Sequence, residues 1–214
     1  MLLTDELKES TRTPHQATEK KMVATLKQLR SKEEYIQLLY WLYGFYSPME
    51  DLIGRHLTGN DLAGSMGVPG SDGIGSLSVG DRDDLPYFVG ERRSDALLRD
   101  IMDSGLPLHH HEDCDHLPVI DSFARALGAL YVLEGSALGG RIIAGMIDKQ
   151  IGLRDSLSFF NGEGAATDKR WQSFKDYLDQ PCFNAQRQDI LAAAQDTFIT
   201  FKNWIDKNEL QPQL

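Results

Sequence analysis

Apolar residues recur at helical spacing through most of this chain, and this periodicity limits its fold more than any other feature. Ser31 and Glu34 form a capping-box pattern that marks a helix start. Behind it, apolar residues repeat every three or four positions as far as about His56, as in a long amphipathic helix. These residues are Tyr35, Leu38, Leu39, Leu42, Phe45, Met49, Leu52 and Ile53.

The same periodicity predicts further helices over about 91–104, ending at Gly105, and over 119–150, 165–179 and 186–207. Only 84–89 shows strand-like alternation. A chain of 214 residues is long enough to bury one core. We therefore predict an all-α fold: one domain over 1–214, built as a bundle of about six to eight helices.

Composition narrows the classes of partner. Hydrophobic residues make up 41% of the chain and charged residues 25%, as in an ordinary globular protein. The formal net charge of −10 disfavours nucleic acid and anionic membranes as main partners. The N-terminal stretch has no apolar region typical of a signal peptide, and we expect no membrane span and a cytoplasmic location. The two cysteines, Cys114 and Cys182, are expected to be free.

Two polar segments interrupt the helical pattern. Glycines crowd residues 58–82, which predicts a flexible loop; no strand precedes them and no helix opens on them, so a phosphate-binding loop is excluded. His109 to His116 could suggest a zinc or iron site, but adjacent loop residues rarely all face one ion, so we favour a solvated loop. An aromatic run circles the 31–56 helix and is interpreted as core packing: Tyr40, Trp41, Tyr43, Phe45 and Tyr46.

His15 and Glu19 are the first candidates for chemistry. They are four residues apart, so both lie on one helix face. A metal-binding histidine commonly donates its second ring N–H to a carboxylate, although a surface histidine beside a solvated glutamate fits the same spacing. Two interpretations of the local helix remain open. Either Thr13 caps a helix that begins at Pro14, or an earlier helix from about Thr4 kinks at Pro14.

The second candidate is the glycine-rich stretch that interrupts the apolar 119–150 helix. Each mid-helix glycine costs about 1 kcal/mol relative to alanine, so three within six residues cost about 3 kcal/mol. Gly135 and Gly139 open one helix face down to its backbone, against which a flat ligand could lie. Close helix–helix packing is the alternative. Glu134 and Arg141 exclude a membrane dimer motif.

Together, LKESTRTPHQATEKKM and LYVLEGSALGGRIIAGMI resemble the heme oxygenase family, and the second is closer to its bacterial, biliverdin-producing members. The likeness extends over most of the chain but not over 58–82. It implies a bundle in which heme is sandwiched between a proximal and a distal helix.

The resemblance also implies individual roles. His15 would be the proximal iron ligand, Glu19 its hydrogen-bonding partner and Phe198 an aromatic wall of the pocket. Lys8 and Arg12 would hold the heme propionates. On the distal side, heme would contact Gly135, Gly139 and Gly140, and the residues implied in catalysis are Gly135, Ser136 and Gly139.

Two positions depart from the family pattern. Ser136 stands where animal enzymes have an aspartate that orders distal water, so activity would depend on backbone groups, the Ser136 hydroxyl and bound water. A basic propionate contact is expected near 172–176, where Gln172 and Asp176 stand instead and Lys175 is a neighbour. The product isomer is therefore open.

The implied reaction is oxidative cleavage of heme, both substrate and cofactor, to biliverdin with release of CO and ferrous iron. The reaction uses O2. Its electrons would come from an external reductant, because the chain carries no flavin fingerprint and no iron–sulfur cysteine spacing. The implied partner is an electron donor, either a ferredoxin or a reductase. Two alternatives remain: a heme carrier or sensor without turnover, and a thiaminase-like relative, which would need a nucleophilic cysteine.

Overall fold

The computed structural model describes residues 1–57, 92–106 and 111–208. Every regular element within these ranges is a helix, which confirms the predicted all-α class. The helices in chain order are α1 (Leu3–Ser10), α2 (Arg12–Gln28), α3 (Lys32–Leu57), α6 (Arg93–Asp103), α7 (Phe123–Ser136), α8 (Gly140–Ile151), α9 (Ser158–Asn161), α10 (Ala165–Leu178) and α11 (Arg187–Lys207). Two 3₁₀ turns, η2 (Ala137–Gly139) and η3 (Pro181–Gln186), lie among them.

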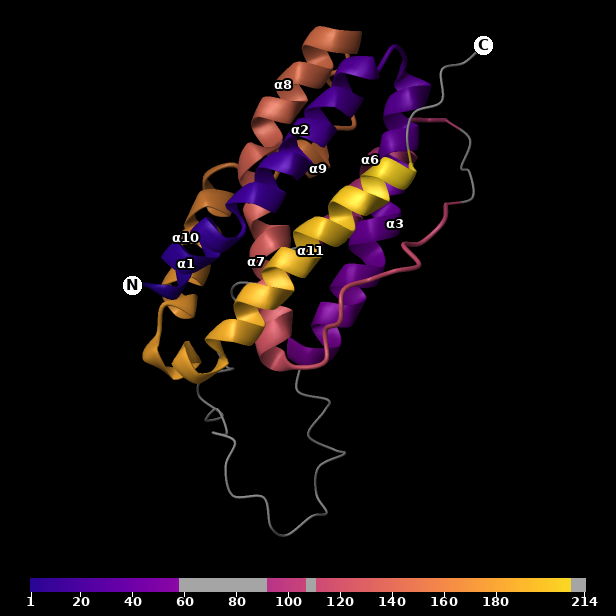
Figure 1. Cartoon of the computed structure of the whole chain (residues 1–214). Helices are drawn as coiled ribbons and strands as arrows, with labels where there is room; N and C mark the ends of the chain where they lie inside the picture. The colour runs from indigo at the N-terminus through magenta and orange to yellow at the C-terminus, as the bar shows by residue number, and fades with distance from the viewer. Residues whose placement is uncertain (58–91, 107–110, 209–214) are drawn as a thin grey trace.

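The C-terminal helix α11 organises the bundle. It crosses the molecule diagonally and packs against α7, α2 and α3 (Figure 1). Gly128 permits the α7–α11 contact, because a Cβ at that position would lie 2.1 Å from the carbonyl oxygen of Ile190. The buried hydrophobic side chains of these helices form one cluster. Around this centre, α2 lies beside α8, while α10 contacts both α1 and η2 (Figure 1).

Most predicted helix bounds are confirmed. α3 begins after Ser31, whose Oγ accepts the N–H of Glu34 at 3.2 Å. The reciprocal half of the capping box shifts by one residue, since the Glu34 carboxylate accepts the N–H of Arg30 at 2.6 Å. α6 is followed by Gly105 in the left-handed region (φ 69°). The helix predicted over 119–150 starts later, at Phe123, and is divided by η2 at the glycine-rich stretch.

The chain bends at Thr11, between α1 and α2. The predicted N-cap at Thr13 is wrong: Thr11 is the N-cap and Pro14 is the third residue of α2. The alternative, an earlier helix disturbed by proline, is closer to the structure. Pro14 has no N–H for the carbonyl of Ser10, four residues before it. The side-chain amide of Gln195 donates to that carbonyl instead, at 3.0 Å.

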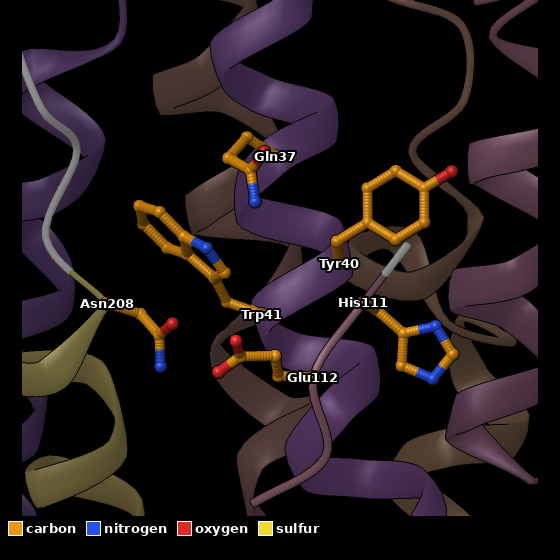
Figure 2. Close-up of a pocket in the computed structure, with 6 residues that line it drawn as sticks. All are labelled: Gln37, Tyr40, Trp41, His111, Glu112 and Asn208. Atoms are coloured by element: carbon orange, nitrogen blue, oxygen red, sulfur yellow. The ribbon is translucent and has the colours of Figure 1, made fainter. Parts of the chain in front are cut away.

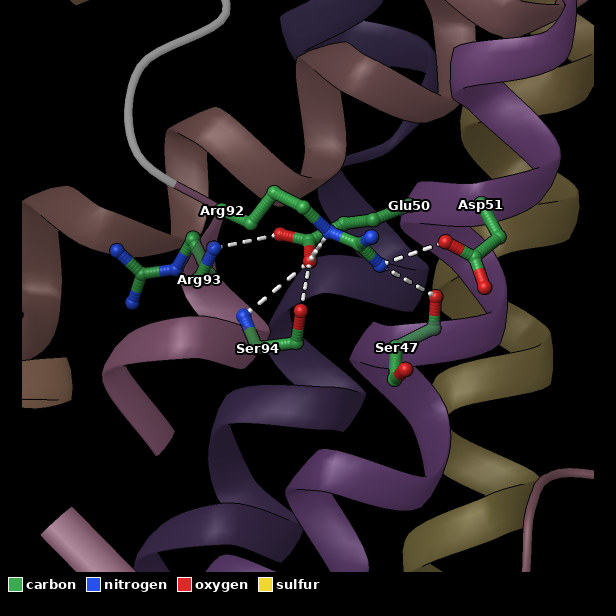
Figure 3. A network of polar contacts seen from close by, with 6 residues as sticks. All are labelled: Ser47, Glu50, Asp51, Arg92, Arg93 and Ser94. Carbon is green, nitrogen blue, oxygen red and sulfur yellow. Dashed lines mark hydrogen bonds and ion pairs between the residues drawn. The ribbon is translucent and has the colours of Figure 1, made fainter. Parts of the chain in front are cut away.

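Helix α6 receives its N-terminal cap from another helix. Glu50 of α3 accepts the N–H groups of Arg93 (2.6 Å) and Ser94 (3.2 Å), the first two residues of α6. Arg92 forms ion pairs with this carboxylate at 3.3 Å and with Asp51 at 2.8 Å (Figure 3). A negative charge at a helix N-terminus satisfies unpaired N–H groups and the helix dipole. This cluster therefore ties α3 to α6.

Two further helices begin in the same way. The fully buried Asp100 of α6 accepts the N–H groups of Ser158 and Phe159, both at 2.9 Å, at the start of α9. Asp179 accepts the N–H and the hydroxyl of Thr4 at 2.9 and 2.7 Å, at the start of α1. Carboxylates distant in sequence thus fix where these helices begin.

The polar segment 111–116 is mostly exposed, as predicted, but its backbone is anchored to a helix. The N–H of Cys114 donates to the carbonyl of Gly44 at 2.8 Å, and a Cβ at Gly44 would lie 2.1 Å from the carbonyl oxygen of Glu112. The segment therefore packs directly on α3. Among the described residues, no group of three or more His, Cys, Asp or Glu side chains is placed to hold a metal ion. The 58–82 loop, the 84–89 stretch, His109 and His110 lie outside the described residues.

One segment of the described structure, Phe123–Ile151, is long and apolar enough to cross a membrane by length and composition. A buried core helix passes the same test, and here α7 packs against α11 and α3 while η2 interrupts the stretch. We interpret it as a core helix. Both cysteines are free, as predicted, with Cys114 buried and Cys182 exposed. The aromatic run on α3 is packed in or against the core, as predicted.

Candidate functional site

Helix α2 presents His15 and Glu19 on one face, as their spacing predicts. His15 Nε2 lies 3.5 Å from Glu19 Oε1, and the two side chains are 51% and 62% exposed. The ring of Phe198 on α11 lies beside His15, with 5.1 Å between centroids and a tilt of 58°. Thr18 Oγ1 donates to the carbonyl of Pro14 at 2.9 Å and lies 3.4 Å from the carbonyl of Phe198, where α2 and α11 are in contact. The structure therefore groups a half-exposed imidazole, a carboxylate and an aromatic wall.

The two predicted cations lie just before His15. Lys8 is exposed in the last turn of α1, and Arg12 is the first residue of α2. Arg12 pairs with Glu9 at 2.9 Å, and both of these side chains are more than 60% exposed. An exposed ion pair of this kind contributes little free energy, so Arg12 can exchange Glu9 for a carboxylate of a ligand.

The three glycines of the α7–α8 junction have different surroundings. A Cβ on Gly140 would lie 2.0 Å from the carbonyl oxygen of Phe160, so this glycine serves the packing of α8 against α9. A Cβ on Gly135 would lie 3.3 Å from the indole ring of Trp171. Only Gly139 has nothing within 4 Å of the Cβ position. The structure thus supports the packing alternative for Gly140 and leaves Gly139 as the open backbone of the predicted distal surface.

Exposed apolar side chains flank Gly139. Leu138 is 40% exposed and Ile142, three residues after Gly139, is 72% exposed. Single exposed apolar residues are common on protein surfaces. Here one lies on each side of an unobstructed glycine, and together they form a surface that a flat apolar ligand would cover.

The Ser136 hydroxyl is already engaged. Its Oγ donates to the carbonyl of Leu133 at 2.6 Å and lies 2.9 Å from the hydroxyl of Tyr46. A serine hydroxyl has one proton, so Tyr46 is the donor in the second contact. Burial raises the pKa of Tyr46, which keeps this phenol protonated. The helical spacing of the aromatic run predicted Tyr46 in the core, as the structure has it, but no local pattern indicated that its hydroxyl reaches Ser136 from another helix.

Helix α10 is fixed beside this junction by an ion pair that the sequence did not indicate. Arg170 binds the buried Glu134 at 3.1 Å and Glu163 at 2.6 Å. Burial outweighs the attraction of Arg170 and raises the pKa of Glu134. In the region where a basic propionate contact was expected, Gln172 donates to Asp176 at 2.8 Å, and Lys175 Nζ lies 5.9 Å from the Trp171 ring centre.

A separate pocket of about 260 Å³ is lined by α3, residues 111–112 and Asn208. It contains none of the predicted site residues. Its lining side chains are Gln37, Tyr40, Trp41, His111, Glu112 and Asn208 (Figure 2).

The cysteines do not support the thiaminase-like alternative. Burial raises the pKa of the Cys114 thiol, which disfavours the nucleophilic thiolate. Cys182 is exposed in η3, where Gln180 is its neighbour at 3.9 Å.

Comparison with known proteins identifies the family and the fold. The family model for heme oxygenase matches residues 1–207. A heme oxygenase of Xanthomonas campestris pv. campestris (strain 8004) is 41% identical over 113 residues, which cover 51% of this chain and 65% of that protein. The aligned part thus spans slightly less than two thirds of this relative.

Two solved structures show the same fold. The heme oxygenase of Leptospira interrogans aligns with a TM-score of 0.64 at 20% identity, covering 97% of this chain and 100% of that one. The NO- and CO-bound heme oxygenase of Neisseria meningitidis aligns with a TM-score of 0.63 at 18% identity, covering 100% and 96%. Because the family model spans nearly all of the sequence, this chain belongs to the heme oxygenase family.

Proposed function

We propose that this protein is a heme oxygenase that binds heme through His15 and cleaves it to biliverdin, with release of CO and ferrous iron. The observation that carries the proposal is the arrangement around His15: a half-exposed imidazole, with Glu19 at 3.5 Å and the Phe198 ring at 5.1 Å. It occurs in a chain that matches the heme oxygenase family over residues 1–207.

The residues present fit heme. Heme is held by an axial ligand to its iron, such as a histidine nitrogen, by apolar contacts on its faces and by cations at its two carboxylates. His15 offers the nitrogen and Phe198 an aromatic contact. Leu138 and Ile142 offer exposed apolar surface beside Gly139. The cations Lys8 and Arg12 stand in the turns preceding His15.

Each residue has a definable task. Glu19 orients the imidazole by accepting its second ring N–H, so that the other nitrogen is free to bind iron. In the structure Nε2 is the nitrogen that faces Glu19, which leaves Nδ1 as the nitrogen not engaged by this carboxylate. A half-turn of the ring about Cβ–Cγ would place each nitrogen where a ring carbon now lies, so that Nε2 would no longer face Glu19. Gly139 leaves space on the distal side.

Bound heme would supply the iron that binds and activates O2. The Ser136 hydroxyl, which already accepts from Tyr46, would donate to a water or ligand oxygen only by turning away from Leu133. The electrons would come from an external donor, a ferredoxin or a reductase, and the cytoplasm would be the compartment.

The direct test is to titrate the purified protein with hemin and then add ascorbate or a ferredoxin system in air. We expect about one hemin per chain, a visible spectrum typical of histidine ligation, and biliverdin after turnover. His15→Ala should lose that spectrum, and added imidazole should restore it. An unchanged ferric spectrum and turnover in His15→Ala would overturn the assignment of the ligand.

Gly139→Leu tests the distal surface. Leucine is the better helix former and meets no neighbour at Cβ, so the variant should fold and bind heme through His15. Its side chain would fill the space beside the iron, so ring opening should fail. Gly145→Leu is the matched control, because Gly145 is exposed on α8, the helix that follows Gly139, with nothing within 4 Å of its Cβ position. Normal biliverdin formation by heme-loaded Gly139→Leu would refute the distal assignment.

A further inference from the structure

We propose that Trp171 on α10 is a specificity-determining residue. Its indole closes one end of the surface formed at Gly135 and Gly139, here called the glycine surface, and sets how heme is rotated within its plane. The inference rests on the proposed function and concerns which meso carbon is attacked. Its basis is the difference between the surroundings of Gly135 and Gly139, the two glycines expected to face heme.

Gly135 and Gly139 both lack a side chain, but only one of them faces open space. At Gly135, the Cβ position is 3.3 Å from the far edge of the Trp171 benzo ring and 3.7 Å from its two adjacent carbons. At Gly139 nothing lies within 4 Å. The absence of a side chain at Gly135 therefore makes room for the indole. A planar ligand that covers Gly139 meets the indole before it can cover Gly135.

The indole is held in this place from several sides. Tyr131, one turn before Gly135 on α7, packs its ring 5.1 Å from that of Trp171. Phe174, which is fully buried, lies 6.3 Å away by ring centroids. The residue before Trp171, Arg170, is tied to the buried Glu134 of α7. Trp171 is thus a fixed boundary of the glycine surface rather than a side chain that swings freely.

The partial burial of Trp171 leaves an edge available for contact. Lys175 lies one turn further along α10, with Nζ 5.9 Å from the indole ring centre. The Trp171 indole thus limits the space for the apolar part of the ligand on the α10 side of the α7–α8 junction, where α10 contacts η2. A rigid porphyrin seated between this boundary and His15 has fewer rotations available about its iron–histidine axis. The steric boundary then selects the ring edge that lies under the distal surface.

The test uses Trp171→Ala, Trp171→Phe and the control Lys169→Ala, whose side chain is exposed on the same helix. Each protein is loaded with hemin and cyanide, and the hyperfine-shifted heme methyl resonances are recorded by NMR. This spectrum reports the seating of heme without turnover. Biliverdin isomers from a single turnover are then separated by chromatography.

We expect Trp171→Ala to show a new set of methyl resonances and a several-fold change in isomer ratio. Trp171→Phe, which keeps an aromatic face, should lie between Trp171→Ala and the wild type, and Lys169→Ala should match the wild type. An unchanged methyl pattern and isomer ratio in heme-loaded Trp171→Ala would overturn the inference alone. Failure of the wild type to bind hemin would overturn the proposed function as well.

A second variant covers the case in which Trp171→Ala does not fold. Gly135→Ala places a methyl group 3.3 Å from the indole, so the ring must shift by a few tenths of an ångström. We expect a smaller change of the same methyl resonances in Gly135→Ala. Wild-type resonances in Gly135→Ala would count against a role for Trp171.

Discussion

Gly139 and Gly140 are adjacent, yet alanine should change stability in opposite directions at these two positions. Both have right-handed helical backbone angles that alanine adopts without strain. On Gly140, a Cβ would lie 2.0 Å from the carbonyl oxygen and 2.9 Å from the carbonyl carbon of Phe160. On Gly139, a Cβ has no neighbour within 4 Å. Alanine at 140 must therefore push α9 away from α8, whereas alanine at 139 displaces nothing.

The magnitude follows from what the new methyl group meets. Ordinary van der Waals separation is about 3.5 Å, so α9 would have to retreat by more than about 1 Å. Its backbone cannot easily turn aside, since the N–H groups of Ser158 and Phe159 are bonded to Asp100. Overpacking of this kind costs about 3 kcal/mol at the upper end of its usual range. The better helix propensity of alanine returns about 1 kcal/mol. We expect Gly140→Ala to lose about 2 kcal/mol and Gly139→Ala to gain up to about 1 kcal/mol.

Urea unfolding followed by far-ultraviolet circular dichroism measures this difference. With a slope of about 2 kcal/mol per molar urea, Gly140→Ala should lower the midpoint by about 1 M and Gly139→Ala should raise it slightly. Gly145→Ala, on an exposed and unobstructed part of α8, should resemble Gly139→Ala. A wild-type midpoint for Gly140→Ala would refute the close approach of α8 and α9. A clear loss of stability in Gly139→Ala would refute the open surface.

Three further predictions concern the cap of α6, a buried phenol and the propionate cations. Glu50→Ala should lower the free energy of unfolding by about 2 kcal/mol, because it leaves N–H groups at the start of α6 unpaired. Asp51→Ala removes only an exposed ion pair and should lower it by about 0.5 kcal/mol or less in the same urea assay. Burial raises the pKa of Tyr131 to about 12, so the unfolded chain, with its ordinary value near 10, ionises first as pH rises. Stability should therefore fall by roughly 2 kcal/mol between pH 10 and 12, and Tyr131→Phe should lose that part of the decline; equal slopes in both proteins would contradict the pKa. Lys8→Ala and Arg12→Ala should each weaken hemin binding by about 1 kcal/mol or less, and unaltered affinity in the double variant would remove both residues from the site.

The parts of the fold that the sequence predicted are those set by local periodicity. The helix behind Ser31 is recognisable because its cap and its apolar face lie within one continuous segment. The helices that begin at carboxylates from elsewhere are different. Glu50 and Arg93 are 43 positions apart, and Asp100 and Ser158 are 58 apart, so no local pattern connects them. Sequence spacing could predict that α6 exists, but not that α3 supplies its cap.

In the candidate site too, contacts within one helix could be predicted from the sequence, whereas contacts between helices could not. His15 and Glu19 share a helix face, so their proximity followed from spacing alone. Phe198 beside His15 required a family resemblance, because it arrives on α11. The contact between Tyr46 and Ser136 joins residues 90 positions apart. The sequence pattern explained Tyr46 fully as a core residue and so gave no reason to expect a second role. Contacts of this kind depend on how the helices cross, which no single segment encodes.

The glycines show how packing and function share one helix. Three helix-interior glycines were expected to cost about 3 kcal/mol, a loss that the ligand surface had to justify. The structure changes that reasoning, because Gly140 is required by the backbone of Phe160 and Gly135 by the indole of Trp171. A side chain at either position would add strain, so these two glycines stabilise the packing they belong to. Gly139 alone has no packing partner, and it lies in a 3₁₀ turn where an α-helical propensity penalty applies only in part. The stability given up for an open distal surface is therefore about 1 kcal/mol or less, a loss that a domain of ordinary stability tolerates.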